Sequence, residues 1–464
     1  MLPNIFREYD IRGVIGKSFL IDEAENLAQS IVTYFLSKNP NINTVTVAMD
    51  GRIHSQAIKE KVINSITQMG INVIDIGLCP TPTFYFSLFM HPESTSGLMI
   101  TASHNPKEYN GMKICFEKQS VFGKEIQEIK KISESQNFFE NKTGKVGTVA
   151  KYDATNLYIK WLTDNFAHLK NLPISALIDC GNGTAGAILP QLISAMGWKN
   201  VKTIYEEIDG NFPNHEADPT TYENMHEIIL KLKNNSTFEL GIGFDGDCDR
   251  MSPITKNGKI VEGDKLLALF SKQILKDVPN ATIVFDIKSS CGLMELLEEW
   301  GAKQILAPSG HSLIKNTMIQ NNAMLAGELS CHFFFKHRYF GYDDGIYAMM
   351  RTFEILLEEN KSLEELLQIF PQKFSSPEYR LTCKEEEKQE IVEKVKSYFS
   401  QKVDAKLITI DGIRAQLPFG WGLVRASNTQ PAMTLRFEAN SYENLEAIKY
   451  EFKIALNPYF QTDF

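Results

Sequence analysis

The sequence predicts an α/β protein whose final block is α+β. Short apolar, β-branched runs alternate with amphipathic segments of helix length over most of the chain, as in α/β folds with largely parallel sheets. At roughly 100 to 200 residues per domain, 464 residues make three or four domains. Hydrophobic residues make up 43% and charged residues 23%, so each domain can bury its own core.

The first two predicted domains span residues 1–148 and 149–253. In the first, apolar runs predict strands at residues 44–49, 73–76 and 97–100, with a helix at 59–69 and a polar linker at 140–147. In the second, the predicted strands are residues 176–179, 201–205 and 240–244, and the helix is 187–196.

The third predicted domain, residues 254–372, repeats this order, and the fourth, 373–464, differs. The third has predicted strands at 282–286, 304–307 and 324–326, with helices at 293–300 and 346–358. The fourth has a strand at 379–383, a charged helix at 384–399, strands up to residue 439 and a closing helix from 443. We interpret the charge run at 384–390 as a solvated first helical turn.

Net charge and cysteine content limit which partners and which cellular compartment we expect for the protein. The net charge is -9, and no stretch is basic enough to neutralise a row of phosphates, so we expect no nucleic acid. Seven cysteines without a Cys-x-x-Cys pair favour reduced thiols and a cytoplasmic location. No run approaches 18 apolar residues and the start is charged, so we expect no membrane contact.

In each of the first three domains, the third strand runs into a polar or glycine-containing loop. These loops are residues 101–106, 245–250 and 327–332. Because ligands bind beyond the carboxyl ends of strands in open α/β sheets, we expect the three loops to converge on one cleft.

The loop at 245–250 predicts a divalent-cation site. Asp245, Asp247 and Asp249 alternate, so an extended loop presents three oxygen ligands to one side. An EF-hand is excluded because its glycine and glutamate positions hold Arg250 and Lys256. The alternative is a solvent-exposed acidic turn. Magnesium fits better than calcium, because three ligands leave room for water and a substrate oxygen.

Two further loops carry candidate chemistry. Ser103 follows a strand and is a candidate nucleophile, although a capped turn has the same composition, and the absence of a Gly-x-Ser-x-Gly motif argues against a hydrolase triad. Residues 425–429, with Arg436, combine a guanidinium, hydroxyls and an amide that suit a phosphate dianion, or form only a polar loop between strands.

The loop at 327–332 offers groups that hydrogen-bond sugar hydroxyls. They are the carboxylate of Glu328, the hydroxyl of Ser330 and the imidazole of His332. A lone glutamate after a strand is more often a salt-bridge partner, and His311 in Gly-His-Ser has the alternative role of a helix-start residue.

A glycine motif supports a rival function. Residues 181–186 match the dinucleotide fingerprint, with Glu206 and Glu207 about 20 residues on, which predicts a nicotinamide-dependent oxidoreductase. The alternative is close packing of strand against helix, and the fingerprint leaves the triple aspartate unexplained. A P-loop at 13–18 is excluded because Ile11 stands where its first glycine belongs.

Taken together, the loops at 101–106, 245–250, 327–332 and 425–429 resemble, in order, the motifs of the α-D-phosphohexomutase superfamily, in particular bacterial phosphomannomutase/phosphoglucomutase. The resemblance covers essentially the whole chain. It implies three mixed-sheet α/β domains and a C-terminal α+β domain similar to the TATA-binding protein, arranged around a central cleft.

The resemblance also implies roles for individual residues. Ser103 carries the transferred phosphoryl group and, with Asp245, Asp247 and Asp249, holds Mg²⁺. Lys113 and His332 are the alternatives for the base. The remaining expected site residues are Tyr9, Arg12, Arg250, Lys288, His311, Glu328, Ser330, Arg425, Ser427, Asn428 and Thr429.

The reaction implied is reversible phosphoryl transfer between the 1 and 6 positions of a mannose or glucose phosphate, with a hexose 1,6-bisphosphate as activator. The partners are then hexose 1-phosphate and 6-phosphate, and we expect a monomer or weak dimer.

A third hypothesis is a non-enzymatic sugar-phosphate-binding regulator. Cys248 and Cys331 stand where the superfamily has glycine, so we expect either a tighter loop or a different backbone angle there. Leu329 replaces methionine and favours glucose or mannose over glucosamine phosphates.

Overall fold

The computed structural model describes residues 5–234, 237–427, 431–457 and 459–460. The chain forms two compact units. The first unit comprises Met1–Glu262 and Ser330–Leu366, and the second comprises Gly263–Leu329 and Leu367–Phe464.

The first sheet of the first unit is mixed. Its strand order is β1-β5-β4-β2-β3-β7, with β6 (Gln119–Ser120) paired to β5. The pairs β2–β3, β2–β4 and β3–β7 are parallel, whereas β5 is antiparallel to both β1 and β4. The strands are β1 (Ile11–Val14), β2 (Thr44–Met49), β3 (Asn72–Leu78), β4 (Gly97–Ile100), β5 (Tyr109–Phe116) and β7 (Val149–Lys151).

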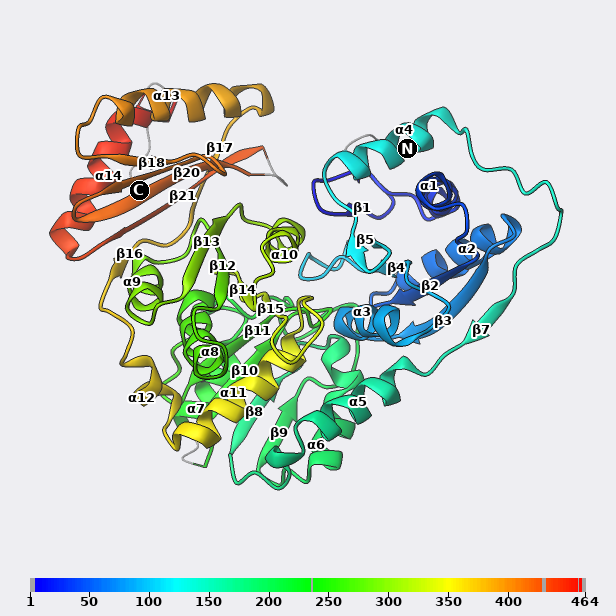
Figure 1. The fold of residues 1–464 in the computed structure, drawn as a ribbon, viewed down its shortest axis with the longest axis horizontal. Helices are drawn as coiled ribbons and strands as arrows, with labels where there is room; N and C mark the ends of the chain where they lie inside the picture. Colours follow the sequence, from blue (N-terminus) through cyan, green and yellow to red (C-terminus); the bar gives the residue numbers. More distant parts are fainter. Residues whose placement is uncertain (1–4, 235–236, 428–430, 458, 461–464) are drawn as a thin grey trace. The chain divides into compact units, whose positions relative to one another are not determined.

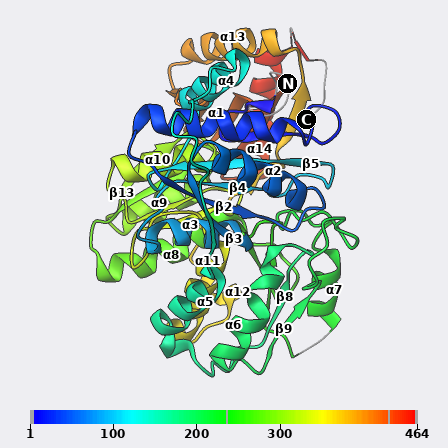
Figure 2. The same cartoon turned by 90° about the vertical axis from the view of Figure 1, so that its right-hand side faces the viewer.

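Helices cover both faces of this sheet. On one face, α1 (Glu23–Lys38), α2 (Ser55–Gln68) and α4 (Lys124–Ser135) share a hydrophobic core with the strands (Figures 1 and 2). On the other, α3 (Thr81–Met90) contacts β2 and β4. Leu98 belongs to the first core and neighbouring Gly97 faces Phe84 of α3, as the alternation of side chains along a strand requires.

The second sheet of the first unit has the order β11-β10-β8-β9. The strands β8 (Ala176–Asp179), β9 (Val201–Ile204) and β10 (Leu240–Phe244) are parallel, and β11 (Met251–Thr255) returns antiparallel to β10. The remaining elements of this unit are α5 (Ala154–Asn165), α6 (Leu189–Met196), α7 (His226–Asn234), β15 (Phe333–Phe335), α11 (Gly345–Glu359) and α12 (Leu363–Leu367), whose last residue begins the second unit.

The second unit contains a parallel sheet and an antiparallel one. In the parallel sheet, β12 (Thr282–Asp286) lies between β13 (Lys303–Ala307) and β14 (Leu325–Gly327). Its helices are α8 (Gly263–Asp277), α9 (Cys291–Glu299) and α10 (His311–Gln320).

The antiparallel sheet forms the α+β part of the chain. Its order is β16-β21-β20-β19-β18, and β17 also pairs with β21. The helices α13 (Lys388–Ser400) and α14 (Tyr442–Leu456) share one hydrophobic core with the sheet (Figure 1). The strands are β16 (Phe374–Ser375), β17 (Tyr379–Thr382), β18 (Lys406–Ile408), β19 (Ile413–Leu417), β20 (Gly420–Ala426) and β21 (Ala432–Ala439).

This architecture confirms the predicted class of α/β domains followed by an α+β block. Sheets are less parallel than the pattern suggested, because β5 and β11 return as antiparallel hairpin partners. The charge run at 384–390 is not wholly a first α-helical turn, since a 3-10 turn at Glu385–Glu387 precedes α13. No disulfide joins the seven cysteines, all of which lie in the described part of the chain. None of the described helices has the length and apolar character needed to cross a membrane.

Candidate active site

Three buried carboxylates gather at the end of β10. Asp245, Asp247 and Asp249 are at most 1% exposed, and each offers an oxygen within 4.8 Å of the others. Burial raises the pKa of Asp245 well above its usual value, and the charges of Asp249 and Asp247 raise it further. The predicted acidic loop is therefore a compact, buried cluster rather than a solvent-exposed turn.

The loop that follows β4 places Ser103 beside this cluster. The Ser103 hydroxyl is buried and donates to Asp245 Oδ2 at 3.0 Å, and His104 Nδ1 lies 3.1 Å from Ser103 Oγ. The backbone of Ser103 is left-handed (φ 50°). A Cβ at Gly246 would lie 2.7 Å from the Ser103 carbonyl oxygen, so the glycine of the acidic loop permits this approach.

Two residues that sequence reasoning missed hold these loops in place. Arg52, which is 3% exposed, donates to the carbonyl oxygens of Ser103 (2.8 Å), Asn105 (2.5 Å), Pro106 (2.9 Å) and Tyr109 (3.1 Å), and Asp50 pairs with it at 3.2 Å. Thr81, the first residue of α3, donates its hydroxyl to Asp247 Oδ2 at 2.7 Å. The only sequence signal was the position of each residue just after a strand.

Two cations offset part of the negative charge. Lys113 on β5 donates to Asp247 Oδ2 at 2.7 Å and also contacts Asp249 Oδ2. Burial alone would lower the pKa of Lys113, but the carboxylates of Asp247 and Asp249 raise it. Arg250 donates its Nε to Asp245 Oδ2 at 3.1 Å and its Nη1 to Asp218 Oδ1 at 3.3 Å. Carboxylates still outnumber cations around the cluster.

His332 and Ser330 also reach this cluster. His332 Nε2 lies 3.4 Å from Asp249 Oδ1, and its Nδ1 lies 3.3 Å from the Ser330 hydroxyl. Asp343, which the sequence did not reveal, offers an oxygen within 4.8 Å of Asp249 and His332.

Arg12 on β1 donates to Asn105 of the serine loop and to Asp10. Tyr9, three residues before Arg12, is half-buried.

The second unit gathers four of the predicted substrate-binding residues. Lys288 follows β12, and its Nζ lies 3.6 Å from Glu378 Oε2. Glu328 follows β14, is 3% exposed and accepts the Gly310 N–H at 2.7 Å, so it contacts the start of the helix that His311 opens. Arg425 on β20 donates to Asp411 Oδ2, which also accepts the Ser309 N–H at 3.0 Å.

Some of the predicted site residues lie in different units, and others lie outside the residues that the structure describes. The unit boundary falls between Leu329 and Ser330, so Glu328 belongs to the second unit and Ser330 to the first. Ser427 accepts from Lys388 Nζ at 2.8 Å through its carbonyl oxygen. Asn428 and Thr429 lie outside the described residues.

The glycine motif at 181–186 packs against the acidic loop. A Cβ at Gly183 would lie 2.8 Å from the Gly246 carbonyl oxygen, which accepts from the backbone N–H of Thr184 at 3.0 Å. The second half of the motif forms a 3-10 turn, Thr184–Ala187, which precedes α6. These contacts give the glycines the packing role that was the alternative to dinucleotide binding.

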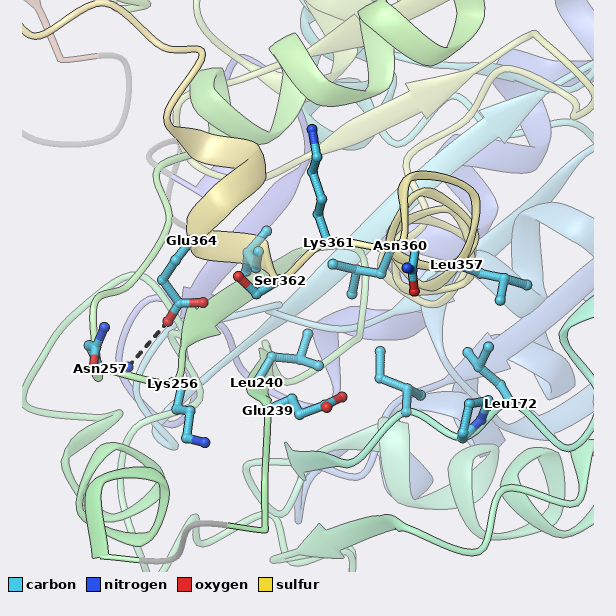
Figure 3. A pocket seen from close by; sticks show the side chains of 14 residues that line it. Leu172, Glu239, Leu240, Lys256, Asn257, Leu357, Asn360, Lys361, Ser362 and Glu364 are labelled. Carbon is cyan, nitrogen blue, oxygen red and sulfur yellow. Dashed lines mark hydrogen bonds between the residues drawn. The ribbon is translucent and has the colours of Figure 1, made fainter.

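A separate pocket of about 610 Å³ lies at the opposite end of β10. Leu240, the first residue of that strand, contributes to its wall together with Glu239 and Leu357 (Figure 3). None of the predicted site residues lines this pocket, and Asp245 lies beyond the other end of the strand. This pocket is thus distinct from the acidic cluster.

The acidic cluster fits a divalent cation by the chemistry of its donors. Carboxylate oxygens are the ligands that Mg²⁺ prefers. Asp247 Oδ1 is buried and has no hydrogen-bond partner among the described residues, which is costly unless a cation binds there. Asp245, Asp247, Asp249 and the oxygen of Ser103 would hold the ion.

Comparison with known proteins agrees with this arrangement. Models of the phosphoglucomutase/phosphomannomutase family match the chain as α/β/α domain I (residues 3–140), domain II (156–258), domain III (262–374) and the C-terminal domain (378–455). A phosphomannomutase/phosphoglucomutase of Pseudomonas aeruginosa is 40% identical over 97% of this chain and 95% of its own length. A phosphoglucomutase of Neisseria gonorrhoeae is 38% identical, with 98% of each chain covered.

A solved structure shows the same fold. A phosphoglucomutase/phosphomannomutase family protein of Burkholderia thailandensis superposes with a TM-score of 0.90 at 34% identity, covering 99% of this chain and 98% of its own. The fold and the acidic cluster define an enzyme of the phosphohexomutase class. The chain belongs to the phosphoglucomutase/phosphomannomutase family.

Proposed function

We propose that the enzyme transfers a phosphoryl group reversibly between the 1 and 6 positions of mannose or glucose phosphate, with Ser103 as carrier. The observation that carries this proposal is the buried Ser103 hydroxyl, 3.0 Å from a triple-aspartate cluster. A hydroxyl in a loop braced by Arg52 is well placed to exchange a phosphoryl group with a bound alcohol, because phosphoryl transfer depends chiefly on positioning and charge.

Two transfers complete the reaction. In the first, the bond between Ser103 Oγ and phosphorus breaks while phosphorus bonds to the free sugar hydroxyl, whose proton leaves to a base, and Ser103 Oγ takes up a proton as it leaves. The product is a hexose 1,6-bisphosphate. In the second, the bond between the other phosphorus and its sugar oxygen breaks while that phosphorus bonds to Ser103 Oγ, whose proton leaves to a base, and the sugar oxygen takes up a proton. Added bisphosphate therefore primes Ser103.

Mg²⁺ at the aspartates would supply positive charge to the migrating group. Arg250 neutralises Asp245 and is a second source of positive charge at the transfer site. Lys113 is held as an ammonium by Asp247 and Asp249, so it serves as the base only after those carboxylates are engaged elsewhere and the ammonium has lost its proton. His332, at 3.4 Å from Asp249, is the alternative base.

The residues proposed to recognise the substrate come from both units. We assign the sugar hydroxyls to Glu328 and Ser330, and the distal phosphate to Lys288, Arg425 and the loop that contains Ser427, Asn428 and Thr429. Tyr9, Arg12 and His311 complete the proposed set. The domain limits 1–148, 149–253, 254–372 and 373–464, the cytoplasmic location and a monomer or weak dimer stay predictions.

A coupled enzyme assay, run beside intact-protein mass spectrometry, tests the proposal. Wild-type protein with Mg²⁺ and glucose 1,6-bisphosphate is expected to convert glucose 1-phosphate or mannose 1-phosphate to the 6-phosphate, and to carry one added phosphoryl mass. Ser103→Ala should lose that mass and reduce kcat at least about 10³-fold. Thermal unfolding of Ser103→Ala at the wild-type temperature is the control for folding. Substantial turnover by this variant would contradict the phosphoserine mechanism.

A further inference from the structure

A buried arginine of the C-terminal sheet clamps the loop that carries Lys288. Arg414 on β19 is 0% exposed. Its Nη1 donates to the carbonyl oxygens of Ile287 at 2.6 Å and Ser289 at 2.8 Å, the residues on either side of Lys288. One guanidinium nitrogen therefore fixes the backbone on both sides of this lysine.

The burial of Arg414 is expensive. Among the described residues, no carboxylate lies within ion-pair distance of its guanidinium, and its Nε has no hydrogen-bond partner. Burial lowers the pKa of Arg414. The ring of Trp421, 3.8 Å from the guanidinium carbon, gives partial compensation through a cation–π contact. A buried charge without an ionic partner is a poor source of stability, which points to a positional role.

The same loop is held at its other residues. Ser289 donates its hydroxyl to Asp286 at 2.7 Å, and the Ser290 N–H donates to Asp264 at 2.9 Å. The Cys291 N–H donates to Glu438 Oε1 at 2.9 Å, an oxygen that also accepts the Trp421 indole N–H at 2.9 Å. Two side chains of the C-terminal sheet, Arg414 and Glu438, thus hold the loop by hydrogen bonds.

The contacts of Arg414 connect the loop that carries Lys288 to the strand next to the one it lies on, which carries Arg425. Arg414 pairs with Leu423 in the β19–β20 ladder, two residues before Arg425 on the same strand. Glu378 lies 3.6 Å from Lys288 Nζ, and the charges of Lys288 and Arg425 both lower the pKa of Glu378 against the effect of burial. Glu378 thus lies within electrostatic reach of both cations, the charge that a phosphate dianion requires.

We propose that Arg414 is a positioning residue that sets Lys288 at a fixed place relative to Arg425 for binding the substrate's phosphate. This inference rests on the proposed function. Lysine in place of Arg414 keeps the charge but loses the planar guanidinium, whose Nη1 donates to both carbonyl oxygens while its face lies over Trp421. The loss should loosen the 287–291 loop and weaken substrate binding without altering transfer at Ser103.

A double-mutant cycle with Arg414 and Lys288 tests the expected effect on substrate binding. Arg414→Lys is expected to raise KM for glucose 1-phosphate about tenfold with kcat within about threefold. In a Lys288→Ala background the same change should raise KM by less than about twofold, because its target is gone. Equal rises in both backgrounds, or a fall in kcat alone, would overturn the proposal.

Amide hydrogen exchange tests the anchoring independently of activity. Exchange at residues 287–291 should accelerate in Arg414→Lys and stay unchanged in Arg351→Lys. Arg351 is the matched control, because it is buried and contacts an aromatic ring but pairs with Glu354 at 3.0 Å in the first unit. Unchanged exchange in Arg414→Lys would refute the anchoring. Absence of wild-type mutase activity would refute only the proposed function.

Discussion

Two cysteines of the active-site loops adopt a backbone that normally selects glycine. Cys248 has φ 67° and Cys331 has φ 69°, both in the left-handed region. Each side chain is therefore accommodated in the left-handed conformation that glycine favours. For a residue with a Cβ this costs about 1 kcal/mol or more. The Cys248 thiol is fully buried, so its packing offsets part of that cost.

Comparing glycine with alanine at residue 248 isolates the backbone cost. Both substitutions remove the thiol, but only glycine removes the Cβ, so Cys248→Gly should be more stable to urea than Cys248→Ala by about 1 kcal/mol. The free energy of unfolding of the two variants gives the measurement. Equal stabilities would show that this loop carries no conformational strain. The aspartate ligands are unchanged, so Cys248→Gly should keep its mutase activity.

At the scale of elements, α11 is joined to the acidic loop through its first turn. Asp344 caps the helix by accepting the Tyr347 N–H at 2.8 Å, and it also accepts the hydroxyls of Tyr158 at 2.7 Å and Tyr339 at 2.6 Å. The Gly345 N–H donates to the Cys248 carbonyl oxygen at 3.2 Å. Burial raises the pKa of Asp344 from 3.8 to about 7, although these hydrogen bonds act to lower it.

The raised pKa predicts a pH-dependent contribution to stability. The folded state binds the Asp344 proton more tightly than the unfolded chain, so this contribution is complete below about pH 4 and is lost as the pH rises through about 7. Asp344→Asn keeps a capping side chain but does not titrate. The wild-type stability minus that of Asp344→Asn, from urea unfolding, should fall between pH 5 and 7 by up to about 1.4 kcal/mol per unit. A pH-independent difference would contradict the shift.

The strands that deliver the active-site loops could be predicted from sequence. Residues 44–49, 97–100, 176–179, 240–244 and 282–286 form strands with the predicted limits, because short apolar runs bounded by turns define buried strands. The α3 helix was not predicted. It is buried from Thr81 to Leu88 on every face, so it has no polar stripe and no helical period.

Supporting side chains escaped prediction for a different reason. Arg52, Thr81, Asp218 and Arg414 act on residues distant in sequence, for example Thr81 on Asp247. Their residue types are ordinary, and only tertiary contacts give them a role. The aspartates and Ser103 were recognisable because several chemical groups were concentrated within one short loop.

At the scale of the whole molecule, the two units divide the chemistry. The first contains Ser103, the three aspartates, Lys113 and His332, whereas the second contains Lys288, Glu328 and Arg425. Each has a hydrophobic core of its own, such as the one around β2 in the first unit and the one beneath α13 and α14 in the second. Chain segments pass between the units after Glu262, Leu329 and Leu366.

Separate cores and an acidic cluster confined to one unit predict how unfolding responds to Mg²⁺. Calorimetry should resolve at least two transitions, because large proteins with several cores depart from two-state behaviour. Mg²⁺ at about 100 times its Kd should stabilise only the transition of the first unit, by about 2.7 kcal/mol. Asp247→Asn should abolish this shift, while Asp277→Asn, at the end of α8 in the second unit, should preserve it. A single transition, or equal shifts of both, would show that the units unfold as one cooperative body and that the cation stabilises the whole chain.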